Sequence, residues 1–353
     1  MIRHSLNSRA TIFTVVLLSA GAVHAQTFKV NKYSLGGDGG TDYLTAEPGT
    51  GRVFVSRATH VMVVDGNTGK IIGDIPDTPR VHGTALVAKW NHGFITNGED
   101  STVSMFDLKT LALIKKIPVP VGGLDGIMYD ESDDRVILTN HSRPVGTATA
   151  IDPKTGEVVG TAELEADSPE GAASDGKGKL FINIEAKGTI QVVDVHSMKA
   201  IASWPIAPCE RPTGIAYDRA SKRIFSGCSN NSVVVDPATG KVVASIPNGG
   251  GVDAMGWDPT EKLAYIPSGA DGKVTIAHQD SPDKYTVVAT VDTMPGAKTI
   301  AVDPKTHRAY LFQPEYGPAP APAADAPAPP PGAPPGRPAR GPVIGAYFFS
   351  ITH

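Results

Sequence analysis

A short turn motif recurs along this chain at a nearly constant spacing, and no other feature of the sequence constrains the fold as strongly. In each copy an aspartate ends an apolar stretch and begins a turn, which in several copies continues as Thr-Gly-Lys or a close variant. Successive copies are separated by 42, 45, 42 and 42 residues, and their aspartates are Asp65, Asp107, Asp152, Asp194 and Asp236. A period of about 40–45 residues is typical of a four-stranded propeller blade. The spacing therefore predicts an all-β chain built from blades.

Each period contains the parts of one blade. An alternating apolar stretch precedes the aspartate, another follows its turn, and a second turn rich in Asp, Pro and Lys lies between copies. These residues favour turns because they preset turn dihedrals or bond to their own backbone. The first strands of the repeats, strands a, start at seven places, near Asp42, His82, Asp125, Glu170, Thr213, Asp253 and Lys298. We expect a seven-bladed β-propeller with strands a, b, c and d in each blade.

The seventh repeat has no outer strand of its own. The chain ends with 344–351 in the position of strand c, whereas 27–35 alternates as the other d strands do. We expect 27–35 to complete blade seven and close the ring, because closure leaves no exposed end blade. An open β-solenoid is the alternative.

A tract dominated by Pro, Ala and Gly, 314–342, interrupts the seventh repeat between strands b and c. Such a composition cannot bury a core, so we predict an extended, mobile loop inserted in the blade. The alternative to a tolerated insertion is a docking segment, because proline-rich chains bind aromatic grooves.

The first 25 residues have the pattern of a secretory signal peptide. Arg3 and Arg9 form a basic start, 11–23 is apolar but shorter than a membrane span, and cleavage is expected after Ala25. We therefore expect a periplasmic or secreted protein with one domain, 26–353, and no membrane span. An uncleaved anchor is the alternative.

The charge of the mature chain is mildly acidic. Without Arg3 and Arg9 the 32 basic residues become 30, against 36 acidic ones, and no Lys/Arg cluster interrupts this balance. Nucleic acid and anionic membrane surfaces are poor partners for such a chain, because both select concentrated positive charge. The two cysteines, Cys209 and Cys228, are expected to form a disulfide in an oxidising compartment.

Several strands carry a recognisable pattern. Phe94–Asn97 leads into Ser101–Asp107, and Val136–Asn140 and Gly188–Asp194 follow the same pattern. It resembles the YVTN β-propeller repeat of the YncE-like family of exported bacterial proteins, which is related in fold to the quinoprotein amine dehydrogenase heavy chain. The resemblance implies a seven-bladed propeller but no particular activity. Repeats six and seven depart from it, with Ala277-His278 in place of the terminal Asp and Gln313 in place of the Asn.

The starts of the a strands should ring the mouth of the central channel. This ring consists of Asp42, His82, Asp125, Glu170, Thr213, Asp253 and Lys298, to which Asn97, Asn140 and His141 could add ligands. Converging carboxylates repel unless a cation offsets them. Oxygen ligands suit Ca²⁺ or Mg²⁺, and His82 extends the choice to a transition metal. The alternative is a polar ring that only solvates a wet channel.

Two functions compete on this evidence. The first is a monomeric binding scaffold whose channel-mouth face contacts a protein or small molecule, because no nucleophile elbow, Walker loop or dinucleotide fingerprint is present. The second is a metal-assisted, lactonase-like hydrolase or lyase with ligands Asp125, Glu170, Asp253 and Asn140. His82 and Glu170 are its catalytic candidates. Electron transfer with a quinone or haem partner would rest on fold analogy alone.

Overall fold

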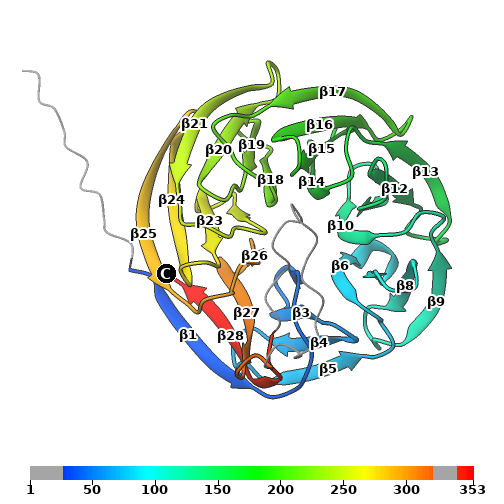
Figure 1. The fold of residues 1–353 in the computed structure, drawn as a ribbon, viewed down its shortest axis with the longest axis vertical. Coiled ribbons are helices and arrows are strands. Elements are labelled where there is room, and N and C mark those ends of the chain that lie inside the picture. The colour runs from blue at the N-terminus through cyan, green and yellow to red at the C-terminus, as the bar shows by residue number, and fades with distance from the viewer. Residues whose placement is uncertain (1–26, 321–339) are drawn as a thin grey trace, which may run out of the picture.

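The predicted seven-bladed β-propeller is confirmed. The computed structural model describes residues 27–320 and 340–353, so the predicted signal peptide lies outside the described residues. Seven four-stranded antiparallel sheets stand around a central axis, with the chain passing from one sheet to the next (Figure 1).

The first four blades follow the order of the sequence, each with strand a nearest the axis. Their strands are β2 (Leu44–Ala46), β3 (Arg52–Arg57), β4 (His60–Asp65) and β5 (Ile71–Ile75) in blade one; β6 (Val81–Val87), β7 (His92–Asn97), β8 (Thr102–Asp107) and β9 (Leu113–Pro118) in blade two; β10 (Leu124–Asp130), β11 (Arg135–Asn140), β12 (Thr147–Ile151) and β13 (Val158–Glu163) in blade three; and β14 (Pro169–Ser174), β15 (Lys179–Ile184), β16 (Thr189–Asp194) and β17 (Lys199–Pro205) in blade four.

Blades five and six continue this order, and blade seven combines both ends of the chain. The strands are β18 (Ile215–Asp218), β19 (Arg223–Ser226), β20 (Asn231–Asp236) and β21 (Lys241–Pro247) in blade five; β22 (Gly256–Asp258), β23 (Leu263–Ser268), β24 (Lys273–Ser281) and β25 (Lys284–Asp292) in blade six; and β26 (Ala301–Asp303), β27 (Arg308–Tyr316), β28 (Val343–Thr352) and β1 (Lys29–Leu35) in blade seven.

The N-terminal strand is the outer strand of blade seven. β1 pairs antiparallel with β28 from Lys29 opposite Thr352 to Leu35 opposite Ala346, and the two strands lie side by side at the edge of the ring (Figure 1). Loss of this pairing would release β1 and leave β28, which still pairs with β27, as an exposed edge strand.

The core lies between the facing sheets of neighbouring blades. Phe54 of blade one and Phe106 of blade two are fully buried with ring centroids 6.1 Å apart, and each buried aromatic side chain contributes about 2–3 kcal/mol of transfer free energy. The repeated aspartate shapes the adjoining turn, since Asp65 Oδ1 accepts hydrogen bonds from the backbone N–H groups of Asn67 and Thr68.

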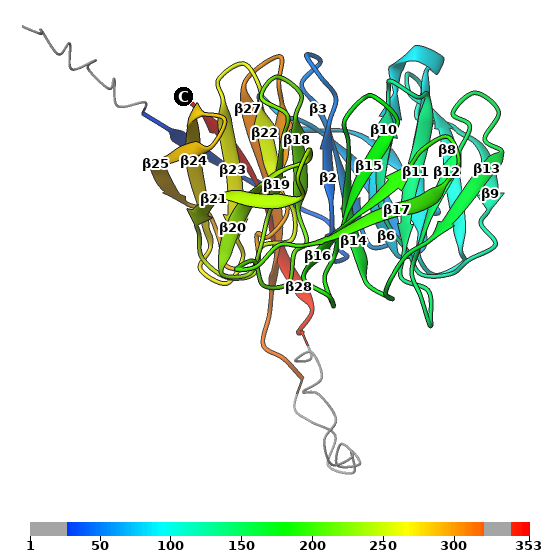
Figure 2. The same cartoon turned by 90° about the horizontal axis from the view of Figure 1, so that it is seen from above.

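The Pro-rich insertion begins later than the composition predicted. β27 continues through Pro314 to Tyr316, which pair with Ala346 and Val343 of β28. The inner neighbour β26 pairs only as far as Tyr310. Pro314 therefore lies where β27 has a free inner edge, and its missing N–H removes no ladder bond. The chain leaves the disc on one face beyond β27 (Figure 2).

Among the described residues the single helix is a 3-10 turn, η1 (Ala88–Trp90). No helix in this part of the chain is long and apolar enough to cross a membrane.

Candidate functional site

The seven predicted ring residues occupy matching places at the starts of the a strands. His82, Asp125 and Glu170 are the second residues of β6, β10 and β14, and the other four lie two or three residues before their strands. Hydrogen bonds tie neighbouring starts together: the N–H of Tyr43 donates to His82 O at 3.0 Å, and that of Asp253 donates to Lys298 O at 3.1 Å. The starts of neighbouring a strands are thus in direct backbone contact at these points of the channel mouth.

A glycine after the polar residue makes this close approach feasible, and the sequence reasoning missed it. The pairs are His82-Gly83, Asp125-Gly126, Glu170-Gly171 and Thr213-Gly214. A Cβ added to Gly126 would lie 2.6 Å from Thr139 Oγ1, and one added to Gly214 would lie 2.4 Å from the backbone carbon of Ala254. In the sequence, this repeated pair of a polar residue and a glycine could have identified the a-strand positions nearest the channel axis.

One side of the mouth brings Asp42, His82 and Asp125 together. His82 Nδ1 lies 2.6 Å from Asp42 Oδ2 and 3.2 Å from Asp125 Oδ1. The three donor atoms come from blades one, two and three, so their proximity follows from ring closure rather than from any local motif. All three lie within 4.8 Å of one another.

A second group adjoins the first and shares Asp125 with it. His141, which directly follows β11, places Nε2 3.0 Å from Asp125 Oδ2 and 3.6 Å from Glu170 Oε1. The same nitrogen lies 2.7 Å from the carbonyl oxygen of Pro169. The result is an alternating row of three carboxylates and two imidazoles over blades one to four.

The carboxylates hold both imidazoles in their charged form. Burial works against the charge of His82, but the hydrogen bonds that its ring donates to Asp125 and Asp42 outweigh it and raise its pKa to about 9. Burial likewise opposes the charge of His141, and the hydrogen bond and charge of Asp125 raise its pKa to about 9.

The three carboxylates differ in their affinity for a proton. Burial raises the pKa of Glu170 to about 8, and the neighbouring charge of Asp125 adds to this shift. Burial also raises the pKa of Asp42 despite its bond to His82. The pKa of Asp125 falls well below its usual range, because its contacts with both imidazoles outweigh its burial.

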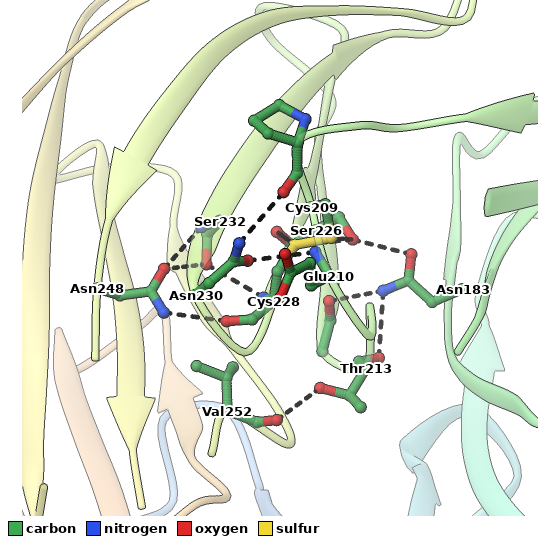
Figure 3. The surroundings of a disulfide bond; sticks show 12 residues. Asn183, Cys209, Glu210, Thr213, Ser226, Cys228, Asn230, Ser232, Asn248 and Val252 are labelled. Carbon is green, nitrogen blue, oxygen red and sulfur yellow. Dashed lines mark hydrogen bonds between the residues drawn. A yellow bond between two sulfur atoms is a disulfide. The ribbon is translucent and has the colours of Figure 1, made fainter. Parts of the chain in front are cut away.

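Blades five to seven carry different chemistry at the equivalent positions. The Thr213 hydroxyl donates to Val252 O at 2.8 Å, and Lys298 forms a salt bridge with Asp253. Thr213 lies beneath the predicted disulfide, which the structure confirms between Cys209 and Cys228 with Cα atoms 5.5 Å apart (Figure 3). Asp253 is paired with Lys298 and belongs to neither three-donor group found among the described residues, so its role as a metal ligand stays a prediction.

The two asparagines also lie outside that row. Asn97 and Asn140 are fully buried. Asn97 Nδ2 donates to the hydroxyls of Thr102 and Ser104, and Asn140 Nδ2 donates to those of Thr147 and Thr149. These bonds tie strand b to strand c through the amide nitrogens, and they leave the Oδ1 atoms of both asparagines buried without a hydrogen-bond partner among the described residues. The role of Asn140 as a metal ligand therefore stays a prediction.

Two cavities accompany the row. A cavity of about 70 Å³ is lined by Arg80, His82, Asp125 and His141 at the mouth. A cavity of about 140 Å³ follows within the channel, where Tyr43 occupies the position of the glycines in other blades. Burial and the nearby carboxylates raise the pKa of Tyr43 well above its usual value, so this phenol remains a neutral hydrogen-bonding group.

The donor distances fit a small cation. Two ligands about 2.1 Å from one ion lie about 3.0–3.4 Å apart at angles between 90° and tetrahedral, close to the 3.2, 3.0 and 3.6 Å contacts of the row. The 2.6 Å contact of Asp42 with His82 is a hydrogen bond, which an ion would open by replacing the shared proton. One nitrogen in each group favours Zn²⁺ or Mn²⁺ over Ca²⁺ or Mg²⁺.

The fold has a relative among solved structures. A chain of the Kuenenia stuttgartiensis hydrazine synthase superposes with a TM-score of 0.69 at 19% sequence identity, over 78% of this chain and 92% of that chain. At this identity the likeness shows the propeller fold alone. No family model matches the sequence, and neither does any curated protein.

Proposed function

We propose that the channel mouth binds a divalent transition-metal ion and that the propeller presents this ion to a ligand on its mouth face. The observation that carries the proposal is the position of Asp125, whose carboxylate contacts an imidazole on each side and completes two three-donor groups. In the metal-free protein the charged imidazoles balance the carboxylates, and a metal ion would bind by replacing the shared protons, because only a neutral imidazole is a metal ligand.

Two further assignments belong to this proposal. The four-strand repeats and their quoted motifs support membership of the YVTN-repeat family. The disulfide supports a periplasmic or secreted location, because such bonds persist in oxidising compartments. An exported propeller with a metal at its mouth would act as a binding module for a small molecule or a protein that supplies the remaining metal ligands.

Metal content tests the function directly. The protein is treated with chelator, dialysed against Zn²⁺ or Mn²⁺, and analysed for bound metal and for affinity by calorimetry. We expect binding that Asp125→Asn weakens by about 100-fold or more, in the range seen when a metal site loses an essential contact. The matched control is Asp253→Asn, at the equivalent position of blade six, which should retain binding. Absence of metal from the wild type would refute the proposal.

A metal-assisted hydrolase or lyase is the second candidate, and Glu170 is the observation that favours it. Its carboxylate borders the row, 3.6 Å from His141 Nε2, where a carboxylate can exchange a proton with a bound molecule. A bound ion would polarise a carbonyl, while Glu170 would hold or release a proton and Arg80, which lines the mouth cavity, would attract an anionic group.

The test of this candidate is turnover of a lactone and ester panel by the metal-loaded protein. Metal-dependent turnover that falls at least tenfold in Glu170→Gln would support it. Absence of turnover in a fully loaded sample would leave binding as the function.

A further inference from the structure

We infer that the channel mouth holds two divalent transition-metal ions, bridged by the Asp125 carboxylate, rather than one. This inference rests on the proposed function and specifies it. The two ions would occupy the group of Asp42, His82 and Asp125 and the group of Asp125, His141 and Glu170.

The two oxygens of Asp125 point to different partners. Oδ1 lies 3.2 Å from His82 Nδ1, whereas Oδ2 lies 3.0 Å from His141 Nε2. The donor atoms of His82 and His141 fall into two separate groups of mutually close atoms, which share only Asp125 among the described residues. A carboxylate that divides its oxygens between two ligand groups has the geometry of a bridge, as in two-metal sites whose ions lie about 3.5–4 Å apart.

Each proposed ion has ligands of its own besides the bridge. The first has Asp42 Oδ2 and His82 Nδ1, which come from blades one and two. The second has His141 Nε2 and Glu170 Oε1, and the hydrogen bond of His141 Nε2 to the Pro169 carbonyl oxygen would open when the ion replaces the proton. Besides the shared Asp125, each group offers one imidazole and one carboxylate. The two groups therefore have the same types of donor, and a metal that binds one group should also bind the other.

Glu170 gives independent support for the second ion. Its residue is only 7% exposed, yet among the described residues no hydrogen bond reaches its carboxylate, and its ion-pair contact with His141 is 3.6 Å long. Buried carboxylates are normally paired or bound to metal. An ion between Glu170 and His141 would supply the missing partner.

The openness of the row leaves room for other ligands. The side chains of Asp42 and His141 are 21% and 35% exposed, whereas that of the bridging Asp125 is 15% exposed. Water or a bound molecule could therefore complete the coordination of each ion from the mouth cavity beside His82 and His141.

Stoichiometry distinguishes one ion from two. The chelator-treated full chain is loaded with Zn²⁺ or Mn²⁺, and bound metal per chain is measured by elemental analysis and calorimetry. We expect two ions in the wild type and a spin-coupled electron paramagnetic resonance spectrum with Mn²⁺. One ion in the wild type would overturn the bridge while leaving the proposed function intact, and no ion would overturn both.

Variants at the two ends of the row assign the positions. Asp42→Asn should lose the first ion and Glu170→Gln the second, so each should bind one Mn²⁺ with the spectrum of an isolated ion. Asp253→Asn is the matched control and should retain two. If Asp42→Asn and Glu170→Gln both retain two coupled ions, the assignment is wrong. The bond between Cys209 and Cys228 and the circular dichroism spectrum serve as folding checks, and each variant is judged only with both intact.

Discussion

The two sides of the channel mouth occupy equivalent positions in one repeat but satisfy their polar groups differently. In blades one to four, Asp42, His82, Asp125, His141 and Glu170 depend on one another across blade boundaries. In blades five to seven, Thr213 bonds to a backbone carbonyl and Lys298 neutralises Asp253. On our proposal the first side accepts a cation, whereas these polar groups of the second side are paired within the protein.

This difference shows that the position in the repeat determines where a side chain lies, whereas the residues of the neighbouring blades determine which partners it contacts. Asp125 and Asp253 both begin an a strand, yet one lies between two imidazoles and the other beside an ammonium group. The following predictions test whether the two sides are as independent as this contrast implies.

The largest effect is expected from removal of the disulfide on the second side. The bond joins residues 19 apart, and a loop of that length contributes about 3 kcal/mol on the chain-entropy account. The double variant Cys209→Ser, Cys228→Ser should lose about that much free energy of unfolding in urea. Its metal affinity should match the wild type. A parallel loss of metal binding would show that the sides are coupled.

Glycine replacements should distinguish the two sides next. In Gly214→Ala the new Cβ would meet the backbone of Ala254 at 2.4 Å, whereas in Gly126→Ala it would meet the side-chain hydroxyl of Thr139 at 2.6 Å. Because backbone yields less readily than a side chain, Gly214→Ala should cost toward the upper end of about 1–3 kcal/mol and Gly126→Ala toward the lower end. Equal losses in thermal unfolding would contradict this ranking.

The stability of the metal-free protein should depend on pH through the first side. The pKa values of His82 and His141 rise from 6.5 to about 9 on folding, so their stabilisation is complete below pH 6.5 and is lost as the pH rises through 9. The raised pKa of Glu170, about 8, acts in the same direction, because ionisation above pH 4.5 is disfavoured in the folded state. The melting temperature should fall by several degrees between pH 6 and 9.5.

The paired residues of the second side give a control for that pH dependence. Asp253→Asn should show nearly the same fall in melting temperature, because its charge is a lesser cause of the raised pKa of Glu170, whereas His82→Asn should show a smaller fall. A pH-independent melting temperature in the wild type would mean that the imidazoles are not held charged by their neighbours.

The smallest effect is expected from Lys298→Met. Lys298 acts on the first side through space, since its charge lowers the pKa of Asp42. Its removal should therefore tighten metal binding by about threefold, the effect expected from removing one positive charge that solvent and salt largely screen. Calorimetric titration would measure the change. Weaker metal binding in this variant would contradict the prediction and would mean that Lys298 helps to hold the site in place.

Much of the fold could be predicted because its signals are local and repeated. Each repeat contains its own turns, alternating strands and a-strand start. The same signals recur in seven blades, so each repeat supports the interpretation of the others. The boundary at Pro314 could not be predicted, because a proline is tolerated there only through the short length of β26. That length is a property of the assembled sheet.

The candidate site could be predicted in part. The ring positions, including His82, Asp125 and Glu170, followed from counting repeats, and His141 was named as an additional ligand. Asn140 and Asp253 lie outside the His-carboxylate row: Asn140 Nδ2 donates to two threonine hydroxyls, and Asp253 pairs with Lys298. Their metal contacts stay predictions, because these partners come from the folded chain and not from the repeat.

The sequence by itself determined the number of blades, the residues at the channel mouth and the pairing of Cys209 with Cys228, since each depends on spacing along the chain. Only the tertiary structure decided which mouth residues meet. Asp42 and His82 are 40 residues apart and His141 and Glu170 are 29 apart, and their side chains converge because closed blades place successive a strands against each other. Side-chain direction at the axis is set by that closure and by the glycines that allow it, and no local pattern records it.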